Sequence, residues 1–283
     1  MERIVTEPGA DWRATLAARA APFAEAGLWI EEVLALDAAL ASMADSDWVA
    51  VTGFKGWLVR DHVHHLTLTD RLATLSAADA DRFRIERELP GPRPRASAPA
   101  PDLPPAELLA AWRTQVAALA ATFADVQPSA RLPWFGPDMS ARAFIVARLM
   151  ETWSHGQTIH DAVGLHRTAT DRLKPICELG WRTFGWSFTV RGLEPPTAPI
   201  SLQLIAPGGA LWRWGAEEAE NSITGPAEDF ALVVCQCRNI ADTRLQVQGA
   251  VAQRWMAIAQ CFAGAANDPP APGTRVPHLR KGG

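Results

Sequence analysis

The sequence predicts a two-domain protein in which a four-helix bundle precedes a small α+β domain. Its 283 residues, 48% of them hydrophobic, can build two cores at roughly 100–200 residues per domain. Apolar residues recur at helical spacing as far as about residue 165, whereas short alternating segments typical of strands follow residue 200. The expected divisions are an N-terminal extension (1–27), the bundle (28–168), the α+β domain (169–265) and a flexible tail (266–283).

Charge and hydropathy exclude two classes of function. The chain has 27 basic and 31 acidic residues, a net charge of −4, and so lacks the basic surface that neutralises nucleic-acid phosphates. No run approaches the ~18 consecutive apolar residues of a membrane span, and residues 1–13 lack the apolar stretch of a signal peptide. We therefore expect a cytoplasmic protein, monomeric or homodimeric, that acts on a small molecule.

The cysteines are expected to be reduced, buried thiols. There are four, Cys177, Cys235, Cys237 and Cys261, in a chain without a sign of export, where disulfides are rare. No C-x-x-C occurs, which argues against a zinc site made of cysteines.

Four helices are predicted in the first half by the period of the apolar residues. They span about 28–44, 57–78, 106–124 and 140–163, with Ser140 as the N-cap of the fourth. A connection with seven prolines between residues 89 and 105 joins the second to the third, and proline keeps such a segment extended. Four helices with one long crossover form a bundle, and bundles build metal sites from side chains on facing helices.

The second half mixes helices and strands. One helix is expected over 170–190 with Thr170 as its cap, and two more over 225–241 and 250–263. Strands are expected at 201–206, 211–214, 221–224 and 245–248, and the Pro-Gly-Gly turn at 207–209 makes the first two a hairpin.

Two groups of polar residues on the second and fourth helices point to a metal site. Glu151 and His155 are four residues apart and share one helical face, as do His62 and His65 at a spacing of three. His160 lies on roughly the opposite face from Glu151. Two histidines and one carboxylate leave a fourth position open, as in catalytic zinc sites. The same spacing also occurs on solvated helix faces and in ordinary hydrogen bonds, so spacing alone leaves both interpretations open.

A family resemblance favours the metal. Residues 56–66 (GWLVRDHVHHL) and 150–157 (METWSHGQ) resemble the second- and fourth-helix signatures of the DinB/YfiT-like metal proteins. They are most similar to proteins like mycothiol-dependent maleylpyruvate isomerase, and WFGPDMS at 134–140 is similar to an uncharacterised actinobacterial-type subgroup. The resemblance continues through TGPAEDF at 224–230 and Ala241-Asp242-Thr243, so it covers about residues 28–265.

The resemblance implies a fold, a ligand set and a chemistry. The first domain would be a DinB-like four-helix bundle with a zinc ion held by His65, Glu151 and His155, and the second a sterol-carrier-like α+β domain. The implied function is a zinc-dependent enzyme that activates a low-molecular-weight thiol for S-transfer or cis–trans isomerisation. Two alternatives stay open: a thiol-independent hydrolase, hydratase or lyase, and a non-catalytic, metal-stabilised binding protein.

Further residues are candidates for supporting roles. His62 and His64 are additional to the family signature, and His62 is the candidate general base or a fourth ligand. Arg238 and Arg244 are candidates for binding a substrate carboxylate across the domain cleft. For both residues, an ordinary surface arginine is the simpler interpretation. Three tryptophans could form the wall of an apolar pocket over the metal or belong to the ordinary core: Trp57, Trp134 and Trp153. Asp161 could orient a histidine from outside the ligand set or simply face solvent.

Overall fold

The computed structural model describes residues 12–18, 23–88 and 99–275. Its contacts divide the chain into two compact units, residues 1–163 and 164–283. The first unit is mostly helical, and the second combines helices with a four-stranded mixed sheet. This confirms the predicted order of a helical region followed by an α+β region. The finer boundaries at 27, 168 and 265 stay predictions.

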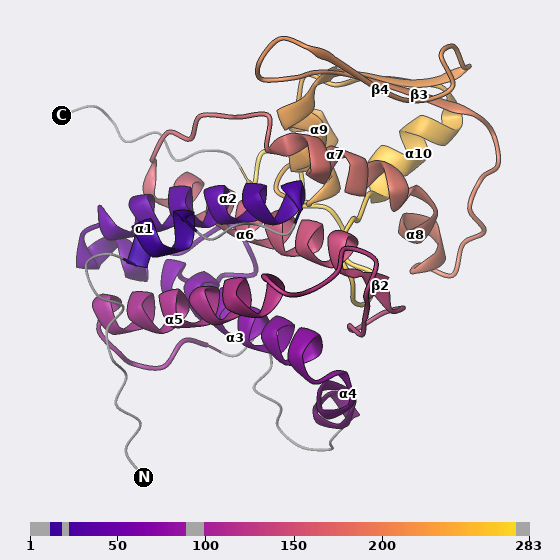
Figure 1. Ribbon diagram of the computed structural model, residues 1–283. Coiled ribbons are helices and arrows are strands. Elements are labelled where there is room, and N and C mark those ends of the chain that lie inside the picture. Colours follow the sequence, from indigo (N-terminus) through magenta and orange to yellow (C-terminus); the bar gives the residue numbers. More distant parts are fainter. Residues whose placement is uncertain (1–11, 19–22, 89–98, 276–283) are drawn as a thin grey trace. The chain divides into compact units, whose positions relative to one another are not determined.

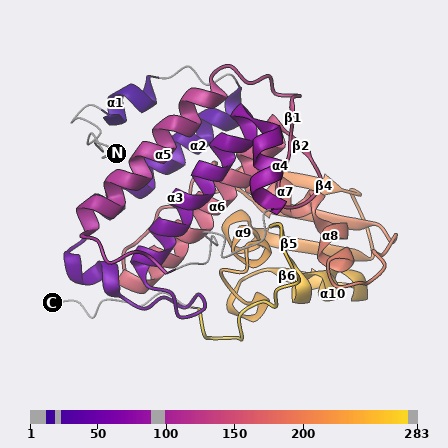
Figure 2. The same cartoon turned by 90° about the horizontal axis from the view of Figure 1, so that it is seen from below.

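Four long helices of the first unit pack against one another (Figures 1 and 2). Helix α3 lies mainly on α5, and α2 on α6, while contacts between α3 and α6 and between α2 and α5 complete the bundle. The elements of this unit are α1 (Trp12–Ala17), α2 (Ala24–Ala41), the 3₁₀ helix η1 (Asp45–Val49), α3 (Val59–Ala78), α4 (Ala80–Glu88), α5 (Pro105–Phe123), the short strands β1 (Arg131–Leu132) and β2 (Met139–Ser140), and α6 (Ala141–Val163).

Local signals start the two helices that carry the histidines. The predicted N-cap of α6 is confirmed, because the hydroxyl of Ser140 accepts a hydrogen bond from the Ala143 amide at 3.2 Å. At the start of α3, the Asp61 carboxylate accepts from the Leu58 amide at 2.8 Å. Helix α6 is buried on most of its surface, as expected for a helix enclosed by others.

The second unit places its helices on one face of the sheet (Figure 1). The strand order is β4-β3-β5-β6, with β3 antiparallel to β4 and parallel to β5, and β5 antiparallel to β6. The predicted hairpin is therefore confirmed. The elements are α7 (Leu173–Arg182), α8 (Phe184–Thr189), β3 (Ile200–Ile205), β4 (Leu211–Gly215), β5 (Asn221–Pro226), α9 (Ala227–Val234), the 3₁₀ helix η2 (Ile240–Asp242), β6 (Gln246–Gln248) and α10 (Ala250–Ile258).

Aromatic side chains fill the core between the helices and the sheet. Trp255 on α10 is fully buried, and its ring meets those of Trp181, Phe184 and Phe230 edge-on, with centroids 5.1–6.1 Å apart. Leu202 and Ile223 are fully buried as well, whereas Ile205 and Leu211 at the ends of the hairpin strands stay exposed. The sheet thus buries one face against the helices, in agreement with the alternation in its strands.

Three predicted helices are wrong in extent. The helix expected over 170–190 is two helices, α7 and α8, that meet at Thr183, and the cap of the first is Arg172, not Thr170. The helix expected over 225–241 ends at Val234, because Gln236 adopts a positive φ of 56° and the chain turns back on itself. The last helix ends at Ile258 and not at residue 263.

Several other features escaped prediction. These are the short helices α1 and α4 and the strand pair β1–β2, each of which packs on a longer neighbouring helix. Segments this short are stabilised mainly by such packing, so their sequences carry no strong apolar period. Residues 266–275 of the expected flexible tail are hydrogen-bonded to the rest of the second unit, through Asn267 to Gln236 and through Gly273 to Asp242. Residues 276–283 of that tail, and 89–98 of the proline-rich connection, lie outside the described residues.

No helix among the described residues has the length and apolar character needed to cross a bilayer. The four cysteines are all free and buried, as expected. Cys235 and Cys237 follow α9 and are not part of it, and the sulfurs of Cys235 and Cys261 lie 3.6 Å apart.

Candidate metal centre

The predicted ligands meet where α3 and α6 cross the interior of the first unit. His62 on α3 contacts His155 on α6, and His65, one turn later, contacts Glu151, one turn earlier. The two helices therefore run antiparallel. Because residues three or four apart share one helical face, each helix presents two side chains to the other.

Three of these side chains converge on one point. His65 Nε2 lies 3.3 Å from Glu151 Oε2, and His155 Nε2 lies 3.4 Å from the same oxygen. The three ligand atoms are all within 4.8 Å of one another, and no other group of three or more such residues is found in the described part of the chain. We call His65, Glu151 and His155 the His–Glu–His cluster.

The spacing fits a tetrahedral metal ion. Zinc binds imidazole nitrogen and carboxylate oxygen at about 2.0–2.1 Å, and two ligands at that distance and at the tetrahedral angle are about 3.3–3.4 Å apart. The two nitrogen–oxygen distances of the cluster match this value. Three protein ligands would leave one position for water or substrate.

The protonation states also suit a cation. Burial alone acts to raise the pKa of Glu151, but the hydrogen bonds from His155 and His65 hold that pKa well below its usual range. Burial, with the like charge of His65, lowers the pKa of His155 to about 4. Near neutral pH the cluster therefore offers an ionised carboxylate and a neutral His155 imidazole, the forms that bind metals.

An aromatic turn lies against one side of the cluster. Residues 53–56 form a tight turn between Val51 and Leu58, which are joined by a β-bridge. This turn places the ring of Phe54 5.6 Å from His155, and the ring of Trp57 5.5 Å from His65. Trp57 thus lies beside the cluster, and its role as a pocket wall stays a prediction.

His62 stands behind the cluster. Its ring is fully buried, and its Nδ1 lies 2.6 Å from Nδ1 of His155. Its Nε2 lies 3.0 Å from the hydroxyl oxygen of Thr52. The structure therefore places His62 next to the cluster, at the ring nitrogen of His155 that is opposite the convergence point. A role for His62 as general base stays a prediction.

The other candidates of the first unit lie apart from the convergence point. His160 Nδ1 donates to the carbonyl of Gly156 at 2.7 Å, and Asp161 accepts from Gln157 at 3.0 Å. Trp134 stacks on Phe83 in a separate aromatic group. Trp153 is buried, with 4% of its surface exposed.

The two arginine candidates belong to the second unit. Arg238 is buried, contrary to the expectation of a surface side chain, and its Nη1 donates to the carbonyl of Cys237 at 2.8 Å. Arg244 is exposed and forms a two-point ion pair with Asp229, at 3.0 Å and 2.9 Å. The carboxylate-binding role of Arg238 stays a prediction.

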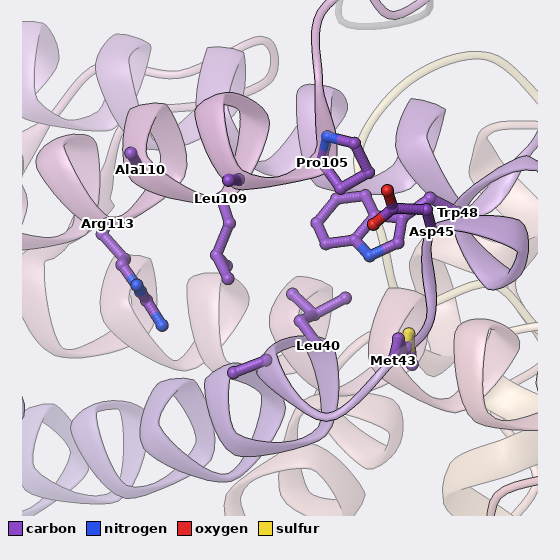
Figure 3. Close-up of a pocket in the computed structure, with 10 residues that line it drawn as sticks. Leu40, Met43, Asp45, Trp48, Pro105, Leu109, Ala110 and Arg113 are labelled. Atoms are coloured by element: carbon purple, nitrogen blue, oxygen red, sulfur yellow. The ribbon is translucent and has the colours of Figure 1, made fainter.

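The first unit also contains a pocket of about 300 Å³ that does not include the cluster. It lies between the C-terminal end of α2 and the N-terminal end of α5, where Leu40, Trp48 and Leu109 form its apolar lining (Figure 3). Its charged lining residues are Asp45 and Arg113, and Arg113 is already bound to Asp37, at 2.7 Å and 3.2 Å. None of the predicted site residues lines this pocket.

Thr52 and Phe54 are the neighbours of the site that sequence analysis did not identify. Both precede α3 in a segment without periodicity, and their contacts to His62 and His155 depend on the fold of the turn. The only local sign of that turn is Gly53 and Gly56, which bracket Phe54-Lys55.

Comparison with known proteins bears on the same residues. Residues 29–160 match the family model described as the mycothiol maleylpyruvate isomerase N-terminal domain. An uncharacterised protein in two strains of Mycobacterium tuberculosis is 38% identical over 234 residues, which cover 81% of this chain and 91% of that protein. The chain belongs to the mycothiol maleylpyruvate isomerase-like, DinB-like family.

A solved structure supports the fold of the family member. A mutant of mycothiol-dependent maleylpyruvate isomerase matches with a TM-score of 0.54 and 16% identity, over 74% of this chain and 86% of that one. At this identity the likeness concerns the fold alone. All three residues of the His–Glu–His cluster lie within the segment that matches the family model.

Proposed function

We propose that this protein is a metal-dependent enzyme that activates a small thiol at the His–Glu–His cluster, for S-transfer or cis–trans isomerisation. The observation that carries the proposal is the convergence of His65, Glu151 and His155 within 4.8 Å of one another, with both nitrogen–oxygen distances close to the tetrahedral value. The family model that matches residues 29–160 is described as the N-terminal domain of mycothiol maleylpyruvate isomerase. This description supports the choice of a thiol as co-substrate. The proposal includes zinc as the metal.

The side chains supply an electrostatic environment for such chemistry. A zinc ion held by these residues would lower the pKa of a coordinated thiol and so favour the nucleophilic thiolate. One carboxylate and two neutral imidazoles leave a net positive charge for an anionic ligand to neutralise. No further base is required at the sulfur, because the thiol proton leaves to solvent.

Burial defines the side from which substrate would approach. The side chains of His65 and His155 are only 13% and 10% exposed, whereas that of Glu151 is 24% exposed. The rings of Phe54 and Trp57 lie 5.6 Å from His155 and 5.5 Å from His65, and they would limit the access of water to these histidines. The thiol and its electrophile would therefore enter beside Glu151, with the aromatic rings as an apolar wall.

Three further assignments belong to the same proposal. The second unit has a sterol-carrier-like fold, its Arg238 binds a substrate carboxylate, and the whole protein is a monomer or a homodimer. An Arg238→Gln variant should then raise KM for an anionic substrate with little change in kcat, while light scattering measures the oligomeric state. An unchanged KM would remove Arg238 from the proposal.

The direct test is an assay with and without a thiol. Zinc-loaded protein is incubated with maleylpyruvate, with mycothiol present or omitted, and formation of the trans isomer is measured; a panel of other thiols and electrophiles follows. We expect turnover that requires both thiol and metal and that is lost in Glu151→Gln. Turnover without any thiol would instead support a metal-dependent hydrolase, hydratase or lyase. Stoichiometric metal without turnover of any tested substrate would support the non-catalytic alternative.

A further inference from the structure

We propose that His62 is a positioning residue that holds His155 in the tautomer and orientation required of a metal ligand, and that Thr52 in turn fixes the tautomer of His62. This inference rests on the metal site of the proposed function but not on its reaction. The observation behind it is a continuous buried relay from Thr52 Oγ1 through His62 to His155, with links of 3.0 Å and 2.6 Å.

The relay determines where each proton lies. A neutral imidazole carries one proton, so when Nε2 of His155 uses its lone pair toward a metal, the proton must be on Nδ1. Nδ1 of His62 lies 2.6 Å from Nδ1 of His155, and must therefore accept the hydrogen bond that this N–H donates. The proton of His62 is then on Nε2, which faces the Thr52 hydroxyl oxygen at 3.0 Å.

Thr52 is suited to receive that proton. Its hydroxyl oxygen has two lone pairs, and it already accepts the amide of Phe54 at 3.2 Å. Acceptance from His62 Nε2 fills the second lone pair. The backbone holds the Thr52 side chain in place, because the Thr52 amide donates to the carbonyl of Trp57 at 2.8 Å. The turn that carries the aromatic wall thus also anchors the relay.

Burial makes the relay difficult to replace. His62 is fully buried and Thr52 is 4% exposed, so water has little access to either side chain. A metal-binding histidine generally donates its second N–H to a protein group that orients the ring, and loss of that group costs about 10–100-fold in metal affinity. In this chain the orienting group is a second histidine.

The geometry distinguishes this role from that of a fourth ligand. His62 meets His155 at Nδ1, whereas the cluster forms at Nε2 of His155, on the other side of the same ring. An ion at the cluster would therefore have the His155 ring between itself and His62 Nδ1. A general base must likewise reach the open position of the metal, and both ring nitrogens of His62 face other partners.

The test compares two variants of similar size at position 62. In His62→Asn the side-chain oxygen can take the place of Nδ1 and accept the His155 proton, whereas His62→Leu has no acceptor. Apo-protein is titrated with Co²⁺, whose visible absorption reports a tetrahedral site, and the Kd and band intensity are measured beside the melting temperature of the apo-protein. We expect His62→Leu to weaken binding by about 10–100-fold and His62→Asn to restore most of the affinity.

Further variants control for packing. Thr52→Val should weaken binding at the lower end of the same range. Thr74→Val, which removes a hydroxyl that donates to the Asp70 carbonyl at 3.0 Å, should leave Kd unchanged. A purely structural role predicts the opposite order at position 62, since Leu suits a buried position better than Asn. Equal Kd values for the wild type and His62→Leu, or Asn no better than Leu, would overturn the proposal. Complete loss of metal in both variants would make His62 a ligand and would also overturn it. Failure of the proposed function is separate: the wild-type protein itself would then bind no Co²⁺, or bind it and turn over no substrate.

Discussion

The guanidinium of Arg148 donates two hydrogen bonds to a single carboxylate oxygen of Asp70, from Nε at 3.1 Å and from Nη2 at 2.9 Å. The two residues are 2% and 0% exposed, respectively. The other carboxylate oxygen accepts from the indole of Trp112 at 3.2 Å. This pair joins α3 to α6 about one turn beyond the His–Glu–His cluster, so it ties together the two helices that carry the ligands.

Breaking this pair should destabilise the first unit strongly. In Arg148→Met the Asp70 carboxylate is left buried without its cation, which costs about 3–5 kcal/mol. The double variant Arg148→Met/Asp70→Leu should cost clearly less than the sum of the single variants, because no uncompensated charge remains. Urea unfolding followed by circular dichroism measures both. Arg71→Met is the matched control, since its partner Glu86 is at the surface and such pairs contribute about 0–1 kcal/mol.

Metal content should depend on the three cluster residues and not on their neighbour. Purified wild-type protein should contain about one divalent metal per chain, mostly zinc, and His65→Ala, Glu151→Gln and His155→Ala should each lose most of it. His64→Ala, on the same helix but outside the cluster, should keep it. Elemental analysis by mass spectrometry gives the stoichiometry. Full metal content in a His65→Ala/His155→Ala protein would show that the site lies elsewhere.

Two glycines of the second unit should respond differently to alanine. Both adopt positive φ, 80° at Gly215 and 85° at Gly209, but a Cβ at Gly215 would lie 2.6 Å from the Trp181 ring and against the Ile200 carbonyl, whereas Gly209 has open space. Gly209→Ala should therefore cost only the backbone strain, about 1–2 kcal/mol. Gly215→Ala should cost about 1–3 kcal/mol more through overpacking. Thermal unfolding of the pair measures the difference, and equal costs would contradict the packing at β4.

The four cysteine thiols should be unreactive toward a thiol reagent in the folded protein. Burial raises the pKa of Cys177 and of Cys235, and all four side chains are enclosed, so thiolate and access are both lacking. Dithionitrobenzoate should react slowly with native protein and rapidly with four thiols per chain after denaturation in urea. Glutathione provides the rate for an exposed thiol. Prompt reaction of any cysteine before unfolding would place that residue at the surface.

Much of the site follows from local features of the sequence. In any α-helix two residues four positions apart share one face, so the proximity of Glu151 and His155 follows from their spacing. The Ser140 cap that begins α6 can also be predicted from the sequence. The family resemblance adds His65 as the third ligand, and the structure brings it to 3.3 Å from Glu151. The order of helical and mixed regions also follows, because hydrophobic period reports local structure directly.

The tertiary structure decided what local patterns cannot contain. His62 and His155 are separated by 93 residues, and whether their Nδ1 atoms meet depends on the rotation and spacing of two packed helices, which periodicity leaves free. The helix expected over 170–190 breaks at Thr183, where α7 packs on α9 and α8 packs on α10. The helix expected over 225–241 ends at Val234, before the positive φ of Gln236. Tertiary packing of this kind overrides helix propensity. The sequence by itself determined which side chains share a helical face. Only the folded chain determined which face met another, because that choice depends on interactions between segments far apart in the sequence.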